Sequence, residues 1–170
     1  HAVGGTTYYS LSLDGSSEYL RNPTATTIGI TNAWSISVWA KAALLDNAMD
    51  LIEITTNAND LNRKRIMVFA ASANDPFRVS VFAAGGATSK VYQYDTFLTI
   101  STWHNIVVTW NGTTLKVYRD GADITYTDQN TDGVATGDNT SSQYVLIGAD
   151  LAGPGDYKWQ GEIGPIAIWS

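Results

Sequence analysis

Apolar and polar residues alternate along most of the chain, in short segments separated by turn residues. The clearest alternation runs from Ala33 to Lys41, where one face carries Trp34, Ile36, Val38 and Ala40 and the other carries Ser35, Ser37, Trp39 and Lys41. A period of two is typical of a β-strand with one buried face. The segment therefore predicts a strand that covers a core.

Similar segments follow at regular spacing. The strongest hairpin signal is Asn111-Gly112 between Trp103 to Trp110 and Thr114 to Arg119, because Asn-Gly accepts the positive φ angles of a two-residue turn. The other predicted strands are Tyr8 to Leu13, Arg65 to Ala71, Phe77 to Ala84, Thr88 to Tyr94, Tyr144 to Ala149 and Lys158 to Trp169.

One segment is open to two interpretations. Lys41 to Ile54 contains good helix formers and could make a helix of three turns. We favour a loop around Asp46-Asn47 followed by a strand from Met49 to Thr56. Many short strands without alternating helices predict a sandwich of two sheets, or a barrel.

Composition narrows the possible functions. The 170 residues suit one domain, 1–170, and the absence of cysteine removes disulfides and thiol chemistry. The net charge is −6, and Arg63-Lys64-Arg65 is the only basic cluster, so we expect no nucleic-acid partner. No run of 18 apolar residues occurs, so we expect no insertion into a membrane.

Several segments, in order, carry a resemblance to a known family. They are Leu11 to Leu20 (LSLDGSSEYL), Trp34 to Lys41 (WSISVWAK), Trp103 to Gly112 (WHNIVVTWNG), Leu115 to Gly121 (LKVYRDG), Tyr144 to Gly148 (YVLIG) and Trp159 to Trp169 (WQGEIGPIAIW). Together they resemble the laminin-G-like jelly rolls of the concanavalin A-like lectin and glucanase type. The resemblance implies an all-β fold, a two-sheet antiparallel β-sandwich.

The resemblance also implies a possible calcium ion, which in such domains joins the N-terminal strand to the last one through an Asp in a G-x-I-D motif. Gly164 stands at that Asp position in this chain. Asp14 and Glu162 are the remaining candidate metal ligands, since calcium prefers oxygen ligands. Asp14 precedes Gly15 and is equally well explained as a turn residue.

Glycan binding is the function that the resemblance favours. Sugars stack on aromatic rings while polar side chains bind their hydroxyl groups. The candidate ligand-binding residues are Tyr92, Tyr94, Tyr126, Tyr157 and Trp159 as platforms, with Asn59, Asp60, Arg63, Asp95 and Asp156 as polar partners. For Tyr92, Tyr94 and Trp159, packing within the sheets is the alternative interpretation.

Catalysis is not expected. Glucanases of this fold use carboxylates that alternate along one strand face, whereas Asp50 and Glu53 are three positions apart and should point to opposite faces. We therefore expect a non-catalytic carbohydrate-binding or adhesion module, outside the cell, on its surface or on a virion. The alternative is a structural or decoration protein of a virus particle or cell surface, assembling with other protein subunits through sheet edges.

Overall fold

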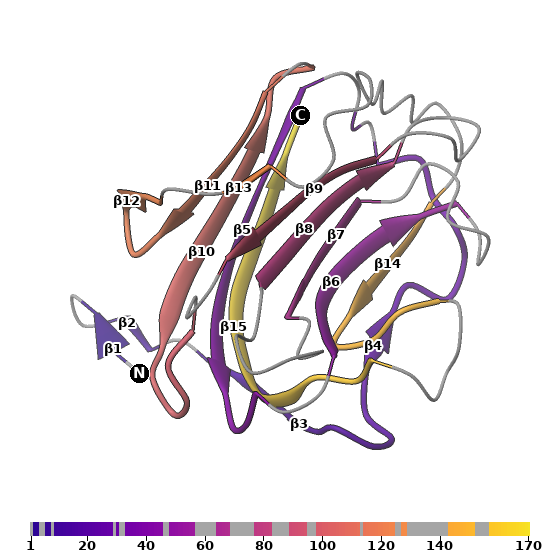
Figure 1. The fold of residues 1–170 in the computed structure, drawn as a ribbon. Coiled ribbons are helices and arrows are strands. Elements are labelled where there is room, and N and C mark those ends of the chain that lie inside the picture. Colours follow the sequence, from indigo (N-terminus) through magenta and orange to yellow (C-terminus); the bar gives the residue numbers. More distant parts are fainter. Residues whose placement is uncertain are drawn as a thin grey trace.

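The computed structural model (Figure 1) is a sandwich of antiparallel strands. It describes residues 2–3, 6–7, 9–28, 30, 33–45, 48–56, 64–68, 77–82, 89–94, 98–112, 114–124, 127–128, 143–151 and 157–170. For β1, β2, β9, β13 and most of β7 and β8, only the backbone belongs to this description.

Two sheets face each other in Figure 1. The six-stranded sheet has the order β12 (Ala122–Asp123), β11 (Leu115–Arg119), β10 (His104–Trp110), β5 (Trp34–Ala42), β15 (Gln160–Trp169) and β3 (Leu11–Asp14). The seven-stranded sheet has the order β13 (Thr127–Asp128), β9 (Ser89–Tyr94), β8 (Phe77–Phe82), β7 (Lys64–Val68), β6 (Met49–Thr55), β14 (Tyr144–Ile147) and β4 (Leu20–Arg21). A separate hairpin joins β1 (Ala2–Val3) to β2 (Thr6–Thr7).

The core lies between the sheets and follows the alternation of the sequence. In β5, Ile36 and Val38 are buried in the core while Trp39 is exposed on the outer face. Ile54 and Ile66 of the seven-stranded sheet meet the same core. The predicted all-β antiparallel sandwich is confirmed. In the segment with two interpretations, the predicted strand is present as β6, while Asp46 and Asn47 of the predicted loop lie outside the described residues. The described residues include no helix that could span a membrane.

An irregularity in β6 decides where its acidic side chains point. The pairing of β6 with β7 shifts between Asp50 and Ile52, which leaves Leu51 as the extra residue of a β-bulge. Leu51 and Ile52 both join the core. Asp50 and Glu53, on either side of them, consequently lie on the same outer face of the sheet.

The chain between β14 and β15 binds to β6 at this bulge. The Gly148 N–H donates to the Leu51 carbonyl (3.1 Å), and the Trp159 N–H donates to the Gly148 carbonyl (3.0 Å). The Asp50 N–H donates to the Tyr157 carbonyl (2.7 Å). These bonds bring residues 148–151 and 157–159 against the acidic part of β6.

Candidate functional site

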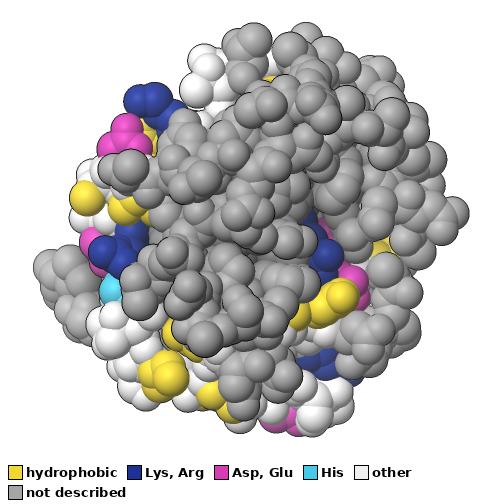
Figure 2. All heavy atoms as spheres, in the orientation of Figure 1, with side chains coloured by type: hydrophobic (Ala, Val, Ile, Leu, Met, Phe, Trp, Pro, Cys, Tyr) yellow, Lys and Arg dark blue, Asp and Glu magenta, His cyan; other side chains and the backbone are white. Residues whose placement is uncertain are grey.

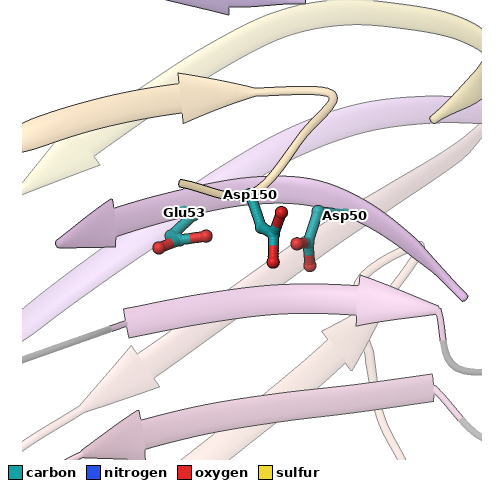
Figure 3. Close-up of side chains that lie close together, drawn as sticks. All are labelled: Asp50, Glu53 and Asp150. Carbon is teal, nitrogen blue, oxygen red and sulfur yellow. The ribbon is translucent and has the colours of Figure 1, made fainter. Parts of the chain in front are cut away.

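Three carboxylates meet on the outer face of the seven-stranded sheet. Asp50 and Glu53 come from β6, and Asp150 comes from the turn that follows β14 (Figure 3). One carboxylate oxygen from each lies within 4.8 Å of the others. All three side chains are buried. We call these residues, together with Arg65, the acidic cluster.

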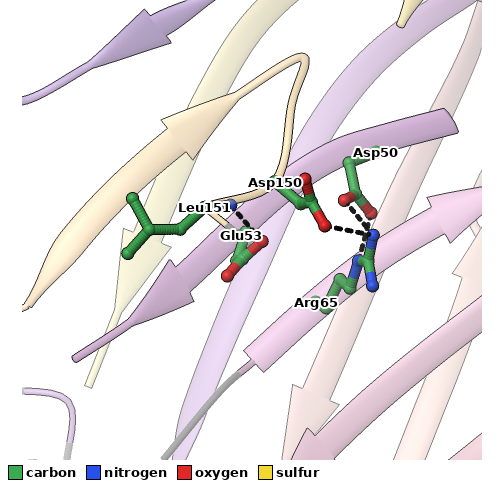
Figure 4. A network of polar contacts seen from close by, with 5 residues as sticks. All are labelled: Asp50, Glu53, Arg65, Asp150 and Leu151. Carbon is green, nitrogen blue, oxygen red and sulfur yellow. Dashed lines mark hydrogen bonds and ion pairs between the residues drawn. The ribbon is translucent and has the colours of Figure 1, made fainter. Parts of the chain in front are cut away.

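Arg65 supplies the positive charge of the cluster. It lies on β7, directly opposite Glu53 in the strand register. Its Nε and Nη2 atoms donate to the two carboxylate oxygens of Asp50, and Nη2 also approaches Asp150 Oδ2 at 3.4 Å (Figure 4). A two-pronged contact of this kind is the strongest that a guanidinium makes with a carboxylate.

The cluster holds more negative than positive charge. Burial, the largest cause, raises the pKa of Asp50 to about 7; the charges of Glu53 and Asp150 also raise it, while Arg65 lowers it. The same three carboxylates raise the pKa of Arg65 against the effect of its own burial. Burial beside two further carboxylates thus favours a proton on Asp50, while the excess of negative charge around Arg65 favours the charged guanidinium.

Tyr157 lies at the edge of the cluster. The Arg65 guanidinium is 4.8 Å from the centroid of its ring, a cation–π contact. Its φ is +63°, which is rare for a bulky residue and is held here by the bond from the Asp50 N–H. About a third of the residue, 36%, remains exposed. In Figure 2, basic, acidic and hydrophobic side chains are visible over the region where Figure 1 draws β6 and β7.

The arrangement supports a fixed surface better than catalysis. Glu53 accepts a hydrogen bond from the Leu151 N–H (3.2 Å), so it anchors the turn after β14. Since Asp50, Glu53 and Asp150 are buried, none of them offers an exposed carboxylate to a substrate. Among the described residues, the cluster supports one exposed ring, that of Tyr157.

The donor atoms of the cluster are the kind that hard cations prefer, and three carboxylates could hold a metal ion. Both oxygens of Asp50 are, however, engaged by Arg65. A cation that used Asp50 would have to displace the guanidinium. The cluster as it stands therefore does not fit a metal ion.

The candidate calcium ligands Asp14 and Glu162 have other partners. Asp14 Oδ1 accepts hydrogen bonds from the N–H groups of Ser16 (2.8 Å) and Ser17 (2.9 Å), and these bonds hold the pKa of Asp14 well below its usual range. Glu162 forms an ion pair with Lys41 and accepts a bond from Ser10 Oγ (2.8 Å). The structure thus gives Asp14 the role of a turn residue and Glu162 that of an ion-pair partner.

The candidate glycan-binding residues have different locations. Trp159 is fully buried in the core, which supports the packing alternative, because a ring without exposed area cannot stack on a sugar. Tyr157 is partly exposed, as the binding hypothesis requires. Tyr92 and Tyr94 lie in β9, where Tyr92 pairs with the core residue Val79. The candidates that lie outside the described residues are Asn59, Asp60, Arg63, Asp95, Tyr126 and Asp156.

Sequence reasoning missed the acidic cluster, and its expectation for Asp50 and Glu53 was wrong. They were expected on opposite faces, but the bulge at Leu51 puts both on the outer face. The sequence carries one weak signal, namely two acidic residues inside an otherwise apolar strand. Charged residues in such a position are seldom buried unless they are paired.

A second group of aromatic residues lies on the opposite sheet. Trp39 is exposed there, and Lys41 Nζ is 5.4 Å from the centroid of the Trp103 ring. A Cβ atom at Gly164 would lie 3.0 Å from the Cβ of Trp39 and 3.4 Å from the Trp103 ring. Gly164 therefore makes room for both tryptophans, which gives a packing reason for the absence of the Asp expected there.

A family model described as the concanavalin A-like lectin/glucanases superfamily matches residues 14–170. The chain belongs to this superfamily. The predicted resemblance to laminin-G-like and concanavalin A-like domains is thereby confirmed. No curated protein sequence matches the chain.

Solved structures with the same fold have low sequence identity to the chain. A heptameric SAP-like pentraxin from Limulus polyphemus has a TM-score of 0.66 at 15% identity, over 94% of this chain and 75% of that one. The CBM40 of an IT-sialidase from Ruminococcus gnavus, bound to α2,3-sialyllactose, has a TM-score of 0.65 at 15% identity, over 84% and 78%. Domain 4 of AbnA, an extracellular arabinanase from Geobacillus stearothermophilus, in complex with arabinotriose, has 0.65 at 16%, over 96% and 75%. At these identities the likeness establishes the fold.

Proposed function

We propose that this domain is a non-catalytic carbohydrate-binding module whose binding surface includes Tyr157, on the outer face of the seven-stranded sheet. The observation that carries the proposal is the way in which this ring is held. Its backbone is in a left-handed conformation, its carbonyl accepts a bond from β6, and its ring lies against the Arg65 guanidinium. A partly exposed aromatic ring fixed by buried partners is pre-organised for stacking on a sugar.

The solved structures with the same fold support this choice of ligand. Two of them are parts of enzymes in complex with oligosaccharides. The CBM40 of the sialidase is bound to sialyllactose, and domain 4 of the arabinanase is bound to arabinotriose. We infer that the domain acts outside the cell, as the name of the arabinanase states for that enzyme. Adhesion, and the alternative of a structural or decoration protein with other subunits, stay predictions.

A glycan-array screen tests the proposal. The domain should bind a related set of neutral or acidic glycans saturably, in calcium and in chelator. Tyr157→Ala should weaken binding about 5- to 30-fold, since loss of one stacking ring costs about 1–2 kcal/mol.

Two control variants make the result specific. Tyr157→Phe keeps the ring and should bind like the wild type. Tyr9→Ala removes an exposed tyrosine that precedes β3 of the other sheet and should have no effect. Absence of binding to every glycan, or equal binding by the wild type and Tyr157→Ala, would contradict the proposal.

A further inference from the structure

The acidic cluster places three carboxylates close together in a buried position. Oxygen atoms of Asp50, Glu53 and Asp150 come within 4.8 Å of one another inside the fold. Asp50 and Glu53 are close together on β6, but Asp150 is far from both in the sequence and joins them only when the turn after β14 closes on β6. Carboxylates this close repel one another strongly at low dielectric, and either a cation between them or a proton on one of them relieves the repulsion.

Arg65 is the cation of this chain that lies between the carboxylates. It contacts Asp50 through two nitrogen atoms and reaches Asp150 with one of them. It thereby connects three segments, namely β6, β7 and the turn after β14. Its guanidinium also supports the ring of Tyr157. A divalent metal ion bound to the carboxylates would make the same connection between β6 and the turn.

We infer that the Arg65 guanidinium takes the place of a divalent metal ion in this cluster, so that the turn after β14 and Tyr157 are positioned without calcium. Burial supports the inference, because a side chain with little exposed area keeps its cation in position permanently. On the other sheet, a partly exposed ion pair joins Lys41 to Glu162, which was a candidate calcium ligand. The inference concerns the stability of the cluster and does not depend on the proposed glycan.

The first test compares the thermal midpoint of the wild type in millimolar calcium and in chelator. If a calcium site were present, a calcium concentration about a hundredfold above its Kd would raise the thermal midpoint by about 5–10 °C in a domain of this size. We expect the wild type and Glu53→Gln to respond to calcium in the same way, because neither has a calcium site at the cluster. A calcium-dependent rise in the wild type that disappears in Glu53→Gln would overturn the inference.

The second test removes the guanidinium. Arg65→Met leaves three carboxylates without their cation, so its midpoint should fall in chelator and recover in calcium. Adding Glu53→Gln to Arg65→Met should reduce that recovery. An Arg65→Met variant with the midpoint of the wild type in chelator, or with no response to calcium, would also overturn the inference. If Arg65→Met does not fold in either buffer, the comparison of the wild type with Glu53→Gln decides.

Discussion

Raising the pH from about 4 to about 7 should destabilise this domain, because of Asp50. The pKa of this carboxyl is about 7 in the fold, against 3.8 for an ordinary aspartate. Between these two values the folded state binds a proton that the unfolded state does not hold. The free energy of unfolding must therefore fall as the pH rises through this window and level off above about pH 7.

The size of the effect follows from the shift. About three pH units at about 1.4 kcal/mol per unit set an upper bound of about 4 kcal/mol for the loss. In a domain of this length, that slope corresponds to about 3–5 °C in the thermal midpoint for each pH unit. Below about pH 4 the trend should reverse, because the pKa values of Asp120 and Glu162 are lowered in the fold and protonation removes their stabilising contacts.

Thermal unfolding followed by circular dichroism from about pH 4 to pH 8 measures this profile. The side chain of Asp50→Asn cannot titrate, so the slope of the thermal midpoint between about pH 5 and 7 should largely disappear in this variant. A midpoint in the wild type that rises over this range would refute the reasoning. A slope that is the same in Asp50→Asn would show that another group causes it.

Two further substitutions, each with a control, test a buried charge and a close backbone contact. Arg65→Met should cost about 3–5 kcal/mol in unfolding by denaturant, because it leaves buried carboxylates without a partner, whereas Lys116→Met, which breaks an exposed ion pair, should change stability by less than about 1 kcal/mol. Similar losses in both variants would contradict this distinction. Gly161→Ala should cost several kcal/mol or prevent folding, because its Cβ would overlap the Lys41 carbonyl oxygen. In the control, Gly121→Ala, the Cβ meets open space, so the cost should be about 1–2 kcal/mol for the positive φ. Equal costs would refute the steric argument.

The sheets of this protein are predictable because their residues alternate. Strand β5 has a regular period of two, and its observed bounds, Trp34–Ala42, differ little from the predicted ones. The hairpin predicted between β10 and β11 is present, but the predicted two-residue turn is not. Trp110 pairs with Leu115, so residues 111–114 connect the strands, and Gly112 has a positive φ (93°) whereas Asn111 does not. Both strand predictions depend on residues that are neighbours in the sequence.

The acidic cluster was not predictable by the same reasoning. A single bulge residue, Leu51, reverses the face on which Glu53 lies, and nothing in the local alternation indicates a bulge. Asp150 joins the cluster only through tertiary contacts. Tyr157 is a candidate because of its residue type, but its support by Arg65 depends on the pairing of β6 with β7.

The central claim is that Tyr157 belongs to a glycan-binding surface, and chemical-shift mapping tests it most directly. An oligosaccharide that binds in the array is titrated into the isotope-labelled domain, and the backbone and aromatic signals are followed. We predict that the largest shifts occur at Tyr157 and the residues beside it, and that Trp39 on the opposite sheet is unaffected. Shifts confined to Trp39 and Trp103, with Tyr157 unchanged, would place the binding surface on the other sheet and contradict the proposal.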